Sequence, residues 1–141
     1  GHRLAVSRPW RGQGEVVQGV DGRGIRHFPF VRELVARAAE QGIPVGIGSS
    51  GSPEKIAHNL SASGIADLFP PELIVSAKHV KSGKPAPDVY LEVLRRMNCR
   101  NPSSAIVIED SINGLKAAKA TGAVTVAITN TMAKDALEEH A

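Results

Sequence analysis

Residues 105–114, AIVIEDSING, are the clearest indication of the fold class of this chain. The first four residues are apolar and mostly β-branched, which is typical of a buried strand in a parallel sheet. Two acids follow, and a polar turn then leads into a helix that carries Leu115 and ends at Gly122, a residue that suits a helix C-terminus. A further apolar run from Val124 to Ile128 completes a strand–helix–strand unit.

The same alternation extends back through the chain. Helix starts and stops are indicated by Gly42, by Ser52-Pro53 and by Pro87, where a cap or a fixed φ angle is expected. The pattern predicts helices near residues 31–41, 52–64 and 87–96, and strands at 43–47 and 73–75. We therefore predict an α/β fold, a three-layer Rossmann-like parallel sheet with helices on both faces.

Composition agrees with one globular domain. The chain has 141 residues, of which 42% are hydrophobic and 22% are charged. No apolar run approaches the roughly 18 residues of a membrane span. The single cysteine, Cys99, excludes an intrachain disulfide and favours a reducing compartment, either the cytoplasm or an organelle lumen, over secretion.

The net charge of +3 raises the question of nucleic-acid binding. Residues 1–27 read as a Gly/Arg-rich leader or linker, and they hold five arginines against Glu15 and Asp21. The core domain predicted at 28–141 is therefore close to neutral, and it has few aromatic residues for base stacking. Both observations argue against a nucleic-acid partner.

Three polar clusters follow or lie near the predicted strand ends, at residues 49–52, 82–88 and 109–113. Parallel strands place their carboxyl ends along one edge of the sheet, where ligands bind in open α/β folds. The clusters are therefore expected to meet in one site.

Ser49, Ser50 and Gly51 lie between a strand and a helix. The serine hydroxyl and the following backbone amides could bind one anion at the helix N-terminus. The alternative is a plain strand–turn–helix junction whose serines only cap the helix.

The stretch Gly83-Lys84-Pro85-Ala86-Pro87-Asp88 has two prolines that fix its backbone. Such rigidity suits a loop that presents one lysine to a site, where its charge would offset phosphate and acidic groups. The alternative is a proline-rich loop with a solvated lysine. For Asp88 we expect a structural role in bracing the loop.

Glu109 and Asp110 are adjacent acids at a strand end. Their mutual repulsion calls for a cation or hydrogen-bond donors, and Mg²⁺ accepts a few carboxylates together with water and phosphate oxygens. The alternative is that one acid caps the helix and the other is solvated.

Three segments together resemble motifs two, three and four of the haloacid dehalogenase (HAD) superfamily: the serine after a strand, GKPAPDVY at residues 83–90 and VIEDSINGLKAA at 107–118. The particular residues in the last two segments resemble those of its β-phosphoglucomutase-like subfamily. The resemblance implies a Mg²⁺-dependent phosphatase or phosphomutase that acts on a small phosphorylated metabolite through an aspartyl-phosphate. By that resemblance Ser49 binds the transferring phosphoryl group, Lys84 stabilises its charge, and the two acids hold Mg²⁺ directly or through water.

The Asp-x-Asp pair that supplies the family's nucleophile is absent from this sequence, and little or no cap is expected. The nearest lookalike, Gly19-Val20-Asp21, would have glycine in place of the attacking aspartate and reads better as a turn. Either an upstream segment supplies the nucleophile, or the chain is a catalytically inactive module with a structural or interaction role. A missing central strand would also expose sheet edges, which predicts self-association, a partner chain, or filling by the leader.

Overall fold

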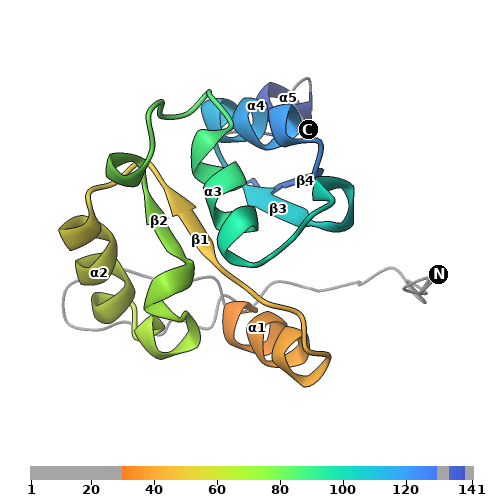
Figure 1. The fold of residues 1–141 in the computed structure, drawn as a ribbon. Helices are drawn as coiled ribbons and strands as arrows, with labels where there is room; N and C mark the ends of the chain where they lie inside the picture. Colours follow the sequence, from red (N-terminus) through yellow and green to blue (C-terminus); the bar gives the residue numbers. More distant parts are fainter. Residues whose placement is uncertain (1–29, 130–133, 139–141) are drawn as a thin grey trace.

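The computed structural model describes residues 30–129 and 134–138 of the chain (Figure 1). The predicted leader, with Gly19 and Asp21, lies outside the described residues. The helices and strands are α1 (Val31–Glu40), β1 (Ile47–Ser49), α2 (Pro53–Ala62), β2 (Ile74–Ser76), α3 (Asp88–Arg96), β3 (Ile106–Glu109), α4 (Ile112–Thr121), β4 (Val124–Ala127) and α5 (Lys134–Glu138).

The predicted helix boundaries agree with the structure. Ser52 caps α2, its hydroxyl accepting a hydrogen bond from the backbone N–H of Lys55 at 3.3 Å. Gly42 and Gly122 follow α1 and α4 with φ angles of 67° and 83°, a left-handed conformation that glycine adopts without steric cost.

The strands are parallel, as predicted, and among the described residues they form two separate pairs, which agrees with the incomplete sheet expected from a missing central strand. β1 pairs with β2 in the register Ile47↔Ile74, and β3 pairs with β4 in the register Ile106↔Val124. Within each pair a helix joins the two strands, as parallel neighbours require. Among the described residues no strand joins β1 to β3.

The first predicted strand, 43–47, is mostly wrong, because β1 begins only at Ile47. Its neighbour explains this difference. Residues before Ile47 would have to pair with the segment before Ile74, and that segment is a 3₁₀ turn, Pro71–Leu73, with no extended backbone to offer.

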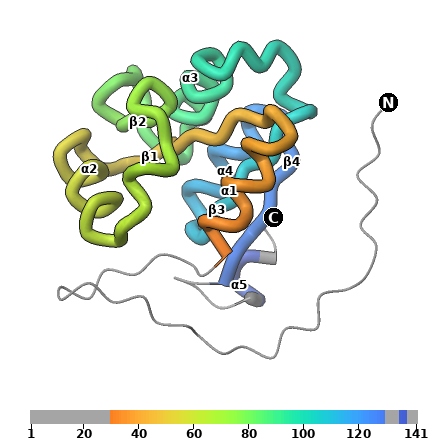
Figure 2. The backbone as a smooth tube through the Cα atoms, turned by 90° about the horizontal axis from the view of Figure 1, so that it is seen from below, coloured from red at the N-terminus to blue at the C-terminus, as the bar shows by residue number. Residues whose placement is uncertain are grey.

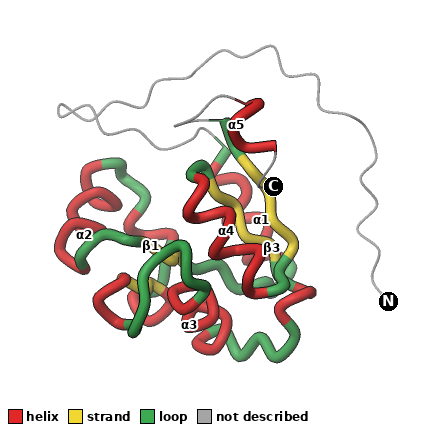
Figure 3. Tube along the Cα trace, turned by 90° about the horizontal axis from the view of Figure 1, so that it is seen from above, coloured by secondary structure: helices red, strands yellow, loops and turns green. Residues whose placement is uncertain are grey.

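Both strand pairs contribute to one core in spite of the missing link between them. A buried cluster joins Val75 of β2 and Val107 of β3 to Val89 and Val93 of α3 and to Ala117 of α4. A second cluster, with Ile56 and Leu60 of α2 at its centre, packs on β1 and β2. Figure 3 shows α2, α3 and α4 gathered around the strands, so helices supply the layers and hold the two pairs together.

One face of the β3–β4 pair is open. Ile106, Ile108, Val124 and Val126 are 60%, 43%, 52% and 40% exposed, and they form two neighbouring cross-strand pairs. Parallel sheets are normally covered on both faces. Figure 2 gives a second view of β3, β4 and the other described elements along the chain trace. No helix in the described part of the chain is long and apolar enough to cross a membrane.

Candidate active site

The lysine loop is braced at both ends and aims Lys84 toward the end of β3. Asp88, the first residue of α3, accepts a hydrogen bond from the backbone N–H of Ser82 at 3.1 Å, which is the structural role expected from the sequence. The peptide bond between Lys84 and Pro85 is cis. A lysine on a braced loop loses little further freedom when it binds.

Lys84 and Glu109 form an ion pair across the site. The lysine Nζ lies 2.7 Å from the Oε1 atom of Glu109, and the two side chains are only 9% and 10% exposed. Tyr90 joins them: its hydroxyl accepts from Lys84 Nζ at 2.6 Å and donates to the same Oε1 at 3.0 Å. Three side chains from the loop, α3 and β3 thus share one hydrogen-bonded cluster.

The second carboxylate oxygen of Glu109 is also fully engaged. It accepts from the backbone N–H groups of Asp110 and Ser111, each at 2.7 Å, and from the Ser111 hydroxyl at 2.9 Å. Gly114 leaves room for this carboxylate, since a Cβ atom there would lie 2.0 Å from the Glu109 Cδ. The orientation of Glu109 is therefore fixed by its surroundings on every side.

The electrostatic balance keeps Glu109 ionised. Burial alone would raise the pKa of its carboxyl, but the hydrogen bond and positive charge of Lys84, with the donors of Ser111, lower the pKa below its ordinary value. Burial raises the pKa of the Tyr90 phenol, and the negative charges of Glu109 and Asp110 raise it further, so the phenol stays neutral and can donate its hydrogen bond.

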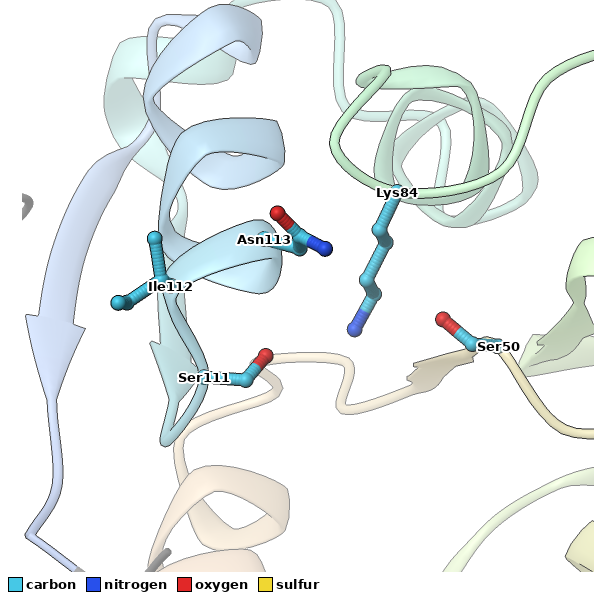
Figure 4. A pocket seen from close by; sticks show the side chains of 5 residues that line it. All are labelled: Ser50, Lys84, Ser111, Ile112 and Asn113. Carbon is cyan, nitrogen blue, oxygen red and sulfur yellow. The ribbon is translucent and has the colours of Figure 1, made fainter. Parts of the chain in front are cut away.

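A cavity of about 530 Å³ lies beside this cluster, lined by Ser50, Lys84, Ser111, Ile112 and Asn113. Figure 4 shows the lysine amine extending between the Ser50 and Ser111 side chains. The cavity therefore joins the carboxyl ends of β1 and β3, the two strands that do not pair with each other.

The serine turn borders the same space. Ser50 lines both this cavity and an adjoining one of about 310 Å³, which also contacts Ser49, Gly51 and Lys55. The Ser49 hydroxyl accepts from the Gly51 N–H at 3.1 Å, so Ser49 holds the turn as well as facing the smaller cavity. Buried Ser76 braces the turn from β2, donating to the Gly51 carbonyl at 2.6 Å.

The predicted residues thus lie in one region, but the serines and the lysine line two different cavities. Ser50 and Lys84 line the larger cavity, whereas Ser49 lines the neighbouring one. Glu109 and Asp110 are adjacent at the end of β3, but the described residues contain no group of three or more His, Cys, Asp or Glu side chains able to hold a metal. Two acids alone would leave most positions around Mg²⁺ to water and phosphate oxygens, which this ion accepts.

Comparison with known proteins decides the family. The sequence profile described as haloacid dehalogenase-like hydrolase matches residues 15–128, most of the chain. This chain belongs to the haloacid dehalogenase-like hydrolase family. The relatives described next support the predicted place of this chain among the HAD phosphatases and phosphomutases.

Two curated relatives and one solved structure illustrate the match. The HAD chain is 34% identical over 122 residues to hexitol phosphatase B of Escherichia coli K12, covering 80% of this chain and 54% of the relative. It is 33% identical over 105 residues to the bifunctional riboflavin kinase/FMN phosphatase of Arabidopsis thaliana, covering 74% and 27%. The structure of CbbY from Rhodobacter sphaeroides in complex with phosphate superposes with a TM-score of 0.67 at 28% identity, covering 75% of this chain and 47% of CbbY.

The HAD chain therefore spans about half, or less, of the length of these relatives. Three residues that contribute to its site were given no role by sequence reasoning: Tyr90, Gly114 and Ser76. Tyr90 and Gly114 stand inside the recognised motifs, and a tyrosine two residues after Asp88 could have been noticed. Ser76 carries no local signal, because its partner, the Gly51 carbonyl, is 25 residues away.

Proposed function

We propose that this HAD chain forms the phosphate-binding and Mg²⁺-binding part of a phosphoryl-transfer site for a small phosphorylated metabolite. The observation that carries the proposal is the buried Lys84–Glu109 ion pair beside a cavity that Ser50 also lines. A structural ion pair needs no cavity, whereas a lysine held at a cavity wall is placed to meet an anion.

The proposed roles follow from the free hydrogen-bonding capacity of each group. Lys84 has three N–H donors, of which two are used by Tyr90 and Glu109, so one is left for a phosphate oxygen. The Ser50 hydroxyl faces the same cavity, and Ser49 with the Gly51 amide shapes the turn. Such fixed donors stabilise phosphoryl charge without reorganising during the reaction.

Charge balance supports the Mg²⁺ requirement. Glu109 and Asp110 bring two negative charges, and Lys84 brings one positive charge, so the cluster would repel a phosphate dianion. A divalent cation would reverse this balance and draw charge from the phosphoryl oxygens. Because Glu109 already accepts five hydrogen bonds, we assign direct contact with Mg²⁺ to Asp110 and contact through water to Glu109.

The family's chemistry passes through an aspartyl-phosphate, and this sequence contains no Asp-x-Asp pair to form one. We therefore expect the 141-residue chain alone to bind phosphate with Mg²⁺ and to hydrolyse little or no p-nitrophenyl phosphate. The similarity to hexitol phosphatase B supports a small phosphorylated metabolite as the substrate class, and the phosphate bound in the CbbY structure supports phosphate binding.

The test is calorimetric titration of inorganic phosphate with and without Mg²⁺. Binding should require Mg²⁺ and should be much weaker in Lys84→Met, whereas Lys119→Met, which removes an exposed lysine from the last turn of α4, should leave it unchanged. Equal binding by both variants, or none by the wild-type chain, would refute the proposed site.

A second function, that of an interaction module, is favoured by the open β3–β4 face. Four exposed aliphatic side chains, with the edges of β1 and β3 that pair with no other described strand, offer a surface to another copy or to a partner chain. If this role holds, sedimentation should reveal association that Ile106→Ser with Val124→Ser weakens. A monomer at all concentrations would exclude self-association. The leader could instead supply the contacts of such a module, through Arg3, Arg8 and Arg11, and these residues lie outside the described part of the chain.

A further inference from the structure

Tyr90 occupies a position that the proposed roles leave unexplained. It lies in the first turn of α3 and is only 7% exposed, yet its hydroxyl reaches the same carboxylate oxygen as Lys84. β1 makes room for the ring: a Cβ atom at Gly48 would lie 2.9 Å from the Tyr90 Cδ1. β1 therefore packs against one side of the ring and blocks its movement in that direction.

The contacts with the lysine are of two kinds. The Nζ of Lys84 donates to the Tyr90 oxygen at 2.6 Å, and it also lies 4.5 Å from the centroid of the ring. The hydrogen bond fixes one of the three N–H directions of the ammonium, and Glu109 fixes a second. Since the ammonium is tetrahedral, two fixed directions also determine the third.

We propose that Tyr90 is a positioning residue that orients the Lys84 ammonium so that its remaining N–H faces the phosphate cavity. This inference rests on the proposed function, because it gives the phosphate-binding lysine its direction. Glu109 alone would hold the ammonium by one hydrogen bond, and the end of the flexible lysine side chain could still swing about that contact together with the ammonium. Phenylalanine at position 90 would keep the ring and remove only the second anchor.

A simpler role for Tyr90, filling the core, predicts different behaviour. Burial of the ring would be preserved by Tyr90→Phe, and any loss of packing would affect phosphate binding whether or not residue 90 contacts a lysine. Orientation through Lys84 predicts that the effect of Tyr90→Phe disappears once the lysine has been replaced, since coupled residues are not additive.

The first measurement uses the fact that Tyr90 is the only tyrosine in the chain. Tyrosine labelled with ¹³C at Cζ then gives a single NMR signal without assignment. In the ligand-free chain, Lys84→Gln should shift this signal clearly, because the phenol oxygen loses a charged donor. An unchanged signal in the folded variant would overturn the inference, whatever the result for phosphate.

The second measurement is a double-mutant cycle of phosphate affinity in saturating Mg²⁺. We expect Tyr90→Phe to weaken phosphate binding about three- to tenfold in the wild-type background, the range of one net hydrogen bond. In the Lys84→Gln background it should have no further effect. A loss of equal size in both backgrounds, or no loss in either, would overturn the positioning role.

Val93→Ala is the matched control for stability, because Val93 is buried in the same helix and no hydrogen bond joins its side chain to the cluster. At a temperature where all variants are folded by circular dichroism, it should leave phosphate affinity unchanged. Failure of the wild-type chain to bind phosphate would refute the proposed function. The ¹³C signal would still decide whether Tyr90 holds Lys84.

Discussion

Replacing Gly114 with alanine should destabilise the protein, although helix propensity predicts the opposite. Gly114 lies in the first turn of α4, where alanine is better than glycine by about 1 kcal/mol. A Cβ atom there would stand 2.0, 2.2 and 2.4 Å from the Cδ, Oε1 and Oε2 atoms of Glu109. Real atoms cannot approach so closely, so the carboxylate must leave its place.

When this carboxylate is displaced, its ion pair with Lys84 and its hydrogen bonds from Asp110 and Ser111 are lost together. Breaking a buried pair, which leaves the Lys84 ammonium without its partner, costs about 3–5 kcal/mol. After the gain in propensity of about 1 kcal/mol, the free energy of unfolding should fall by about 2–4 kcal/mol. Urea denaturation in metal-free buffer, followed by circular dichroism, measures this change directly.

Two further variants test the reason for the loss. Gly83→Ala, whose new Cβ would be 3.9 Å from its nearest neighbour, should change stability by less than about 0.5 kcal/mol. In a Glu109→Ala background the new Cβ atom has no carboxylate to clash with, and Gly114→Ala should then leave the free energy of unfolding unchanged or raise it. A loss of the same size in both backgrounds, or a stabilised Gly114→Ala single variant, would refute the steric argument.

Three other outcomes are expected. Because the folded-state pKa of Glu109 is lowered from 4.5, its ion pair should stabilise the protein above about pH 4.5 and lose that effect as the pH falls through the folded-state value. Urea titrations at a series of pH values should show this fall in the free energy of unfolding for the wild type, and a smaller fall for Glu109→Gln. Asp110→Asn should weaken Mg²⁺ binding at least tenfold by calorimetry, with the melting temperature in metal-free buffer as the control for folding; undiminished binding would exclude Asp110 as a ligand. Ser76→Ala should cost about 1–3 kcal/mol in urea denaturation, since the Gly51 carbonyl loses its buried donor; a change below 0.5 kcal/mol on the same scale would show that the contact is dispensable.

Local signals predicted most of the elements. Ser52-Pro53 marks the start of α2, Gly122 marks the end of α4, and the apolar run before Glu109 marks β3. Caps and prolines act on the residues beside them, so their effect can be read without knowing the rest of the fold. The strand predicted at 43–47 failed because a strand needs an extended neighbour, and the neighbour there is a 3₁₀ turn.

The site was predictable in its members but not in its connections. The motifs named Lys84, Glu109 and Asp110, and parallel strand ends predicted one shared edge. The motif places a tyrosine in the first turn of α3, but no local pattern indicates that its hydroxyl bridges Lys84 and Glu109.

The order of most helices and strands, the family and the available chemical groups could be inferred from the sequence, because they depend on short-range patterns of polarity, proline and glycine. Tertiary packing was needed to establish which strands pair, that one face of the β3–β4 pair is exposed, and that Lys84 meets a carboxylate 25 residues away. Pairing and side-chain contact depend on which surfaces the packed helices bring together, and no local pattern specifies that arrangement.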